Sequence, residues 1–140
     1  MSSLLEFTQI TAARAHLKEI YDSAERHVPA VVRREDDAPV AVVRRDDLHR
    51  ALRALCPLDP QVRFADDGHV SLWLDGLPVS AQAGDLSAVE RGLIEALRDY
   101  ADVWVEDLSR YPHHEDAWGV VNLVLLSTDS ELEAHLFGED

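Results

Sequence analysis

The side chains best suited to hold a metal ion stand together as His113, His114, Glu115 and Asp116. A metal site needs ligands that converge on one point. Adjacent histidines in an extended loop point apart, and no two histidines of the chain are spaced four residues apart, as a helical pair would be. We therefore expect a solvated loop here, and we predict no bound metal and no cofactor.

The other reactive side chains do not form a recognisable active site. Cys56 is the single cysteine, and a thiol beside Pro57 with no neighbouring base is a poor nucleophile. Asp66, Asp67 and Asp75 fall in predicted turns, whereas a nuclease core needs carboxylates that converge at strand centres. The sequence contains no phosphate-binding glycine loop and no nucleophile elbow. We predict that the protein is not an enzyme.

The charge of the chain is divided unevenly along its length. Residues 1–55 hold nine Lys/Arg and nine Asp/Glu, whereas residues 56–140 hold four Arg and eighteen Asp/Glu. The net charge of −14 therefore falls wholly in the second part. A polyanion would be repelled by the second part and accepted by the first, and a basic protein would be drawn to the second. The simpler alternative is that the acidic residues serve solubility.

The chain length and the positions of two prolines predict two small domains. A chain of 140 residues supports one ordinary domain or two very small ones. Prolines at positions 57 and 60 mark a boundary, so we expect domains at residues 1–56 and 61–140. The chain has no run of about 18 apolar residues, and its N-terminus lacks the basic-then-apolar layout of a signal peptide. A cytoplasmic protein with no membrane contact is expected.

Two consecutive helices are predicted after a short edge strand at residues 4–7. Thr11 is a plausible N-cap of the first helix. Arg14 would then lie in the first turn, where a cation opposes the helix dipole, and this mismatch suggests an external anion such as phosphate. Residues 17–28 repeat apolar side chains at helical spacing, and Pro29 would end that second helix.

A β-hairpin and a third helix should follow. Ala30–Val32 and Val40–Val43 are β-branched runs, and Asp37 would take the left-handed conformation in the turn between them. Both runs are apolar on successive residues, which suits a sheet covered on both faces. The helices would cover one face, and the other needs a second copy of the sheet or a partner, which predicts a homodimer. Asp46 should cap the third helix.

Three short motifs occur in this domain in a fixed order: TAARAHL at residues 11–17, AVVRR at residues 30–34 and AVVRRDDL at residues 41–48. In order and spacing they resemble the Phd/YefM-type (prevent-host-death) antitoxins, which are DNA-binding antitoxins of bacterial toxin–antitoxin pairs. The resemblance covers residues 4–55. The chain departs from the family pattern at Asp37, where a glycine is usual. It also departs at Arg44 and Arg45, where a small polar residue commonly precedes the helix.

This resemblance implies a βααββα module that dimerises and presents helix starts and strand-end arginines to double-stranded operator DNA. Carried over by position, it assigns DNA contact to Thr11, Arg14, His16, Arg33 and Arg34. Arg14 and Arg34 are the strongest candidates, and Thr11 could hold a phosphate through its hydroxyl or the helix N-terminus. The alternative for each arginine is a solvated surface charge.

The second domain is predicted to be a βββα(α) module, so the fold class of the whole chain is α+β. Alternating apolar residues predict strands at 61–65, 69–74 and 78–83. Capping boxes at Ser87 and Ser130 would begin a long helix and a short terminal helix. Residues 118–126 are apolar enough for either a buried helix or a final strand. Three strands followed by a helix resemble the HicB antitoxin fold, a partial RNase H-like unit.

Four aromatic side chains of the second domain are candidate anchors for a protein partner. They are Trp73, Trp104, Tyr111 and Trp118, and interface hot spots favour such residues. Packing in the core is the alternative for each. The family resemblance implies a basic cognate toxin as the partner, because such toxins commonly handle RNA or nucleotides.

The leading hypothesis is a type II antitoxin. It would be a homodimer that represses its own operon through the first domain and neutralises a toxin through the second. One alternative is a stand-alone transcriptional regulator whose second domain binds a ligand or a partner. Another is a protein-interaction or immunity-like module that never touches DNA.

Overall fold

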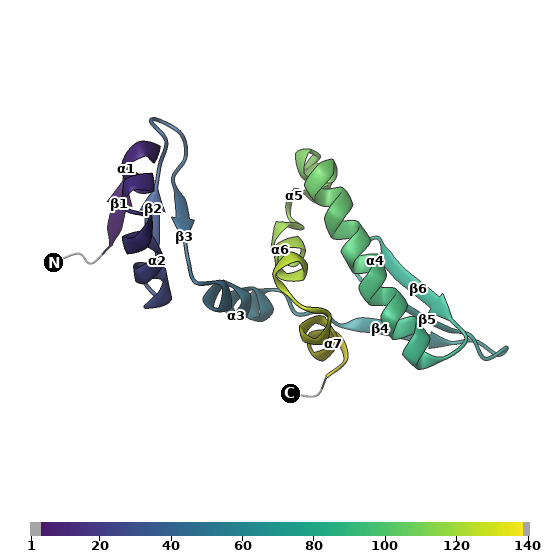
Figure 1. Ribbon diagram of the computed structural model, residues 1–140. Coiled ribbons are helices and arrows are strands. Elements are labelled where there is room, and N and C mark those ends of the chain that lie inside the picture. The colour runs from purple at the N-terminus through teal and green to yellow at the C-terminus, as the bar shows by residue number, and fades with distance from the viewer. Residues whose placement is uncertain (1–3, 139–140) are drawn as a thin grey trace. The chain divides into compact units, whose positions relative to one another are not determined.

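Figure 1 shows the computed structural model, which describes residues 4–138 as an α+β protein, the predicted fold class. The chain divides into two compact units, the first ending at Arg50 and the second beginning at Ala51. The first contains β1 (Leu5–Phe7), α1 (Ile10–Ala15), α2 (Leu17–Glu25), β2 (Ala30–Val32) and β3 (Val40–Val42), and α3 (Arg45–Leu55) crosses the division. The second contains β4 (Pro60–Phe64), β5 (Val70–Leu74), β6 (Val79–Ala83), α4 (Leu86–Glu106), the 3-10 turn η1 (Leu108–Arg110), α5 (Pro112–Glu115), α6 (Trp118–Leu126) and α7 (Asp129–Phe137).

The first unit is a three-stranded sheet with two helices packed on it. β2 lies in the centre, parallel to β1 and antiparallel to β3. The buried core contains Ala13, Ile20, Ala30 and Val32, with Leu5 and Phe7 packed against them. All three residues of β3 are exposed. The predicted strand, helices and hairpin are therefore present, but a large part of their apolar surface is uncovered within this unit.

The first helix begins earlier than predicted, and this changes the roles of two residues. Gln9 is extended (φ −140°, ψ 140°) and forms the N-cap of α1 without a side-chain hydrogen bond. Thr11 thus lies inside the helix, and its predicted capping role is wrong. Because α1 has only six residues, Arg14 lies in its last turn, where the helix dipole favours a cation. The predicted electrostatic mismatch is therefore wrong, and the helix dipole gives no reason to expect an external anion at Arg14.

The second helix ends at Glu25, before Pro29, because the chain turns at His27. His27 has a φ of 70°, in the left-handed region that few non-glycine residues adopt. The N–H groups of His27 and Val28 donate to carbonyl groups in the last turns of α2, which is the Schellman pattern. The His27 imidazole also lies 2.9 Å from the Asp47 carboxylate. The hydrogen bonds at the C-terminus of α2 therefore end this helix before the chain reaches Pro29.

The turn between β2 and β3 uses a different residue from the one predicted. Glu35 takes the left-handed conformation with a φ of 52°, and Asp37 does not. Asp37 instead closes the turn, since its N–H donates to the Arg34 carbonyl and its carboxylate accepts from Arg34 Nε at 2.9 Å. The third helix begins at Arg45, so the predicted capping role of Asp46 is also wrong. Asp46 lies in the first turn, where a carboxylate suits the helix dipole.

In the second unit, one long helix packs against an antiparallel sheet. β4, β5 and β6 are neighbours in chain order, and Gly68 closes the first turn with a φ of 92°. Alternate residues of β5 are buried, namely Val70, Leu72 and Leu74, and they join a core formed mainly with α4. The α4 residues in this core include Val89, Leu93, Leu97 and Tyr100, as the helical spacing predicts.

The N-caps of two helices differ from the predicted ones. Asp85 caps α4, because its carboxylate accepts from the Ala88 N–H at 2.8 Å, and the predicted box at Ser87 is wrong. Thr128 caps α7 in a reciprocal capping box with Glu131. In both cases an acceptor side chain stands just before the predicted start and forms the cap first.

The segment between α4 and α7 is helical throughout most of its length. Residues 118–126, for which the sequence leaves helix and strand open, form α6, and three of its apolar side chains (Val121, Leu123 and Val124) are buried. The polar stretch at residues 109–116, expected to be a loop, contains part of η1 and all of α5. Within residues 4–138, no helix combines the length and hydropathy that a membrane span requires.

Arg98 joins α4 to the link between α6 and α7. Its guanidinium donates to the carbonyls of Val124 at 2.7 Å and Ser127 at 2.8 Å, and to the Asp129 carboxylate at 2.7 Å. Carbonyls at a helix C-terminus have no partner inside the helix. Arg98 supplies donors to this region, while its pair with Asp129 is largely exposed and contributes little.

Replacing Arg98 with alanine should lower the free energy of unfolding by about 2–3 kcal/mol, because partly buried carbonyl groups lose charged donors. Urea titration followed by circular dichroism would measure this change. The matched control is Arg91→Ala, an exposed arginine of the same helix, which should cost less than about 0.5 kcal/mol. Equal stabilities of the two variants would contradict the role given to Arg98.

Candidate functional site

Two of the predicted DNA-contact residues lie together in the first unit. Thr11 and Arg34 line one open hollow with Gln9, Ile10 and Glu35. They meet because β1 and β2 are parallel, so the segments that follow the two strands both begin at the same end of the sheet. The ion pair between Arg34 and Asp37 is exposed on both sides, and such a pair is weak enough to be exchanged for a phosphate.

The other three candidates belong to the same unit but do not form one cluster with Thr11 and Arg34. The Arg33 N–H donates to the Phe7 carbonyl at 2.8 Å, which extends the pairing of β1 with β2. His16 stacks on the Phe7 ring, with 5.5 Å between ring centroids, and lies 3.8 Å from the Glu19 carboxylate. Arg14 stands on α1 with its side chain exposed. Neither Arg14 nor Arg33 forms an ion pair with any residue in the described part of the chain.

The first unit also has an open apolar face. Tyr21 on α2 is 66% exposed, Val40 is 61% exposed, and Val42 and Val43 are each 38% exposed. Tyr21, Val42 and Val43 line a hollow whose edge carries Glu25, Arg44, Arg45 and Asp46. Apolar side chains of this size are normally covered in a stable fold, so this face fits an interface.

The four aromatic residues predicted to bind a toxin occupy different environments. Tyr111 and Trp118 are about half exposed, at 48% and 53%, and are free to meet a partner. Trp104 is half-buried, and its indole Nε1 donates to the His114 carbonyl at 2.7 Å, so it also holds α5 in place. Trp73 is half-buried opposite Ser80 of the neighbouring strand, on the sheet face turned away from the α4 core.

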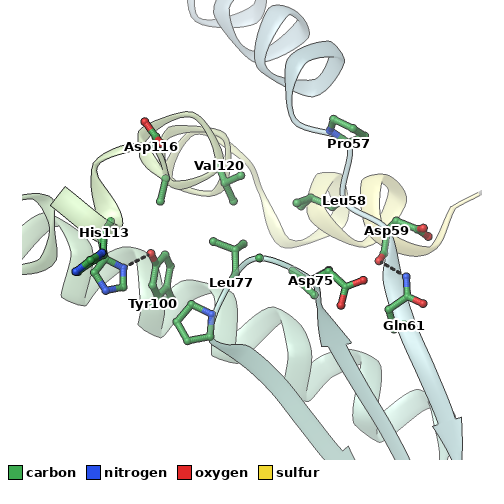
Figure 2. Close-up of a pocket in the computed structure, with 15 residues that line it drawn as sticks. Pro57, Leu58, Asp59, Gln61, Asp75, Leu77, Tyr100, His113, Asp116 and Val120 are labelled. Atoms are coloured by element: carbon green, nitrogen blue, oxygen red, sulfur yellow. Dashed lines mark hydrogen bonds between the residues drawn. The ribbon is translucent and has the colours of Figure 1, made fainter. Parts of the chain in front are cut away.

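A hollow of about 420 Å³ lies in the second unit, and Figure 2 shows its lining. The lining comes from the start of β4, the β5–β6 turn, Tyr100 of α4, and the α5–α6 region. Leu58, Leu77 and Val120 lie around its middle, and the carboxylates of Asp59 and Asp116 lie at its edge. No sequence motif predicts this site, because its residues come from separate segments that only the fold brings together.

One wall of this hollow is held by a buried pair of rings. The Tyr100 hydroxyl lies 3.0 Å from His114 Nδ1, and burial raises the pKa of Tyr100. The phenol therefore stays neutral and acts as a hydrogen-bonding group. The expected solvated loop is wrong for His114, which is half-buried through this contact and the one with Trp104, whereas His113 is exposed at the hollow.

Catalytic and metal chemistry have little support in the described residues. Among residues 4–138, no group of three or more His, Cys, Asp or Glu side chains is placed to hold a metal ion. Cys56 packs against Gly119, where an added Cβ would lie 3.0 Å from the sulfur. Burial raises the pKa of the Cys56 thiol, which lowers the fraction of reactive thiolate near neutral pH.

Comparison with known proteins identifies the group to which this chain belongs. A family model named PHD-like, described as the antitoxin of RelE/RelB toxin–antitoxin systems, matches residues 2–120. The chain belongs to this antitoxin family. Membership implies a toxin partner. No curated protein matches the chain.

The antitoxin also has a structural neighbour. A crystal structure from Syntrophomonas wolfei subsp. wolfei, described as the antitoxin part of a candidate toxin/antitoxin system, aligns with a TM-score of 0.79. The alignment covers 99% of each chain at 19% sequence identity. At this identity it shows that the two proteins share a fold, and nothing further. These comparisons do not confirm the finer resemblances, to Phd/YefM-type proteins in the first half and to HicB in the second.

Proposed function

We propose that this antitoxin neutralises its toxin by direct binding through residues 61–140 and represses its own operon through residues 1–56. The observation that carries the proposal is the family match over most of the chain, joined to the division of charge. An acidic second half attracts a basic toxin, and the arginine-bearing first half suits DNA phosphate. In this reading, the first half is a Phd/YefM-type module.

Toxin binding is best supported on the acidic second unit. The exposed rings of Tyr111 and Trp118 offer apolar anchors within a strongly negative surface. Such anchors at an interface centre supply most of the binding free energy, and the surrounding charges steer the encounter. The toxin would be blocked sterically, with no catalytic step.

Co-expression with the product of the neighbouring reading frame tests the antitoxin function. The full chain should restore growth to cells that express that product, and the two proteins should co-purify. The double variant Tyr111→Ala/Trp118→Ala should weaken the complex by about 10- to 100-fold, because hot-spot aromatic residues are removed. Leu125→Ala, at a similarly exposed apolar residue of α6, is the control. Growth arrest that the full chain does not relieve would contradict the proposal.

The open apolar face of the first unit supports homodimerisation. It includes Tyr21 of α2 and Val40 and Val42 of the edge strand β3, each of them exposed. A second copy placed on this face would cover the apolar side chains and also protect an open sheet edge. In the family that the sequence resembles, dimers are the form that presents paired arginines to an operator.

Introducing a charge on this face should separate the dimer. Val42→Asp should give a monomer in light scattering at micromolar concentration, because an unpaired carboxylate would be buried in the interface. The control is Leu86→Asp, since Leu86 is also exposed, at 47%, and begins α4, where an acidic residue suits the helix dipole. A monomeric wild-type chain would contradict the dimer.

DNA binding is proposed for the hollow that contains Thr11 and Arg34, together with Arg14, Arg33 and His16. Arg34→Ala and Arg14→Ala should each weaken binding to the chain's own promoter by a few kcal/mol or less, and should reduce its salt dependence. A mobility-shift titration at several salt concentrations would measure both. Lys18→Ala is the control, because Lys18 lies on α2 and does not line the hollow that contains Thr11 and Arg34. Binding unchanged in both arginine variants would remove this hollow from the site.

The hollow of the second unit favours one alternative, a stand-alone regulator that binds a ligand there. Its apolar middle and charged edge are features of small-molecule sites. The co-expression experiment also decides between the two functions, since a stand-alone regulator would have no toxin partner.

A further inference from the structure

We infer that the hollow of the second unit receives an arginine side chain of the toxin. This inference rests on the proposed function and adds to it the point at which the partner is held. The hollow combines an apolar middle with carboxylates that have no cation of their own, and its walls are fixed by contacts within the unit (Figure 2).

The apolar part of the hollow fits the stem of a long basic side chain. Leu58, Leu77 and Val120 line it, with Leu74 and Pro57 beside them. Arginine covers apolar surface with its methylene groups while its charged head stays at the edge. A hollow of about 420 Å³ that is open on one side can admit such a side chain from a partner.

No lysine or arginine lines the hollow. Asp59, Asp75 and Asp116 line it with exposed side chains, and none of the three forms an ion pair with a residue in positions 4–138. Two of the four arginines in residues 56–140 are engaged elsewhere: Arg98 pairs with Asp129, and Arg110 lies 3.6 Å from Asp107. A guanidinium from outside would supply the missing charge and could bind carboxylates with two parallel hydrogen bonds.

Hydrogen bonds within the unit hold one wall of the hollow. Tyr100 and His114 are joined at 3.0 Å, and the Trp104 indole holds the His114 carbonyl at 2.7 Å. A site that needs no ordering on binding keeps more of its interaction free energy.

The pocket can be probed without the toxin. Amide NMR shifts of the full-length protein would be followed during titration with N-acetyl-arginine methylamide, and with the uncharged isostere N-acetyl-citrulline methylamide. Arginine, but not citrulline, should shift residues around the hollow, among them Gly76, Leu77 and Ala117. The double variant Asp75→Asn/Asp116→Asn should remove these shifts. Equal shifts with both compounds, or none with arginine, would overturn the inference.

The same double variant then tests the complex. Its affinity for the toxin should fall about 10- to 100-fold, since a buried charge loses its partners, whereas the control Glu95→Gln, on the exposed side of α4, should leave affinity unchanged. Wild-type affinity in the double variant would overturn this inference and leave the antitoxin function intact. If the wild-type chain does not bind the toxin at all, the proposed function fails, and the inference fails with it.

Discussion

The second unit depends on a cation placed at the end of a helix. α6 is almost wholly apolar, and the carbonyl groups at its C-terminal end need donors from beyond the helix. Ser127 provides two of them, since its N–H donates to the Val124 carbonyl and its hydroxyl donates to the Leu123 carbonyl. The guanidinium of Arg98 adds charged donors from α4 to the carbonyls of Val124 and Ser127. Because Ala117 and Val120 also line the hollow, the hydrogen bonds that fix α6 also fix the shape of the candidate binding site.

The first unit has the opposite difficulty, since it has too little core. Its three strands have three residues each, and only β2 among them is largely buried. A unit of about 50 residues buries a smaller share of its surface on folding than a larger domain does, so its stability is marginal. The proposed second copy would cover the open strand edge and the exposed valines beside it.

The two units also differ in the charges that they leave uncompensated. In the first unit, Arg14 and Arg33 form no ion pair with an acidic residue among the described residues. In the second unit, Asp59, Asp75 and Asp116 form no ion pair with a basic residue among the described residues. Charges of this kind do not determine a fold, because exposed pairs contribute little to stability. They do influence which partners are attracted, and a charge-balanced first part joined to a strongly acidic second part suits a protein with two different partners.

The sequence by itself determined the α+β class, most of the strands and helices, and the assignment to the antitoxins of toxin–antitoxin systems. Period-two and helical apolar patterns report which face of an element is buried, so they located β5, β6 and α4 well. The same patterns are silent on helix ends. Three helices have N-caps other than the predicted ones, namely Gln9, Asp85 and Thr128. The second helix ends through the turn at His27, before Pro29 is reached. Local hydrogen bonds decide such positions, and several neighbouring residues can make them.

Only the tertiary structure decided which distant residues meet. The parallel pairing of β1 with β2 brings Thr11 to Arg34, and a purely local pattern contains no information about strand direction. The hollow likewise needs Leu58, Leu77, Tyr100 and Val120 from four segments. Burial patterns show that each side chain is partly covered, but only the packing of one element on another determines what covers it.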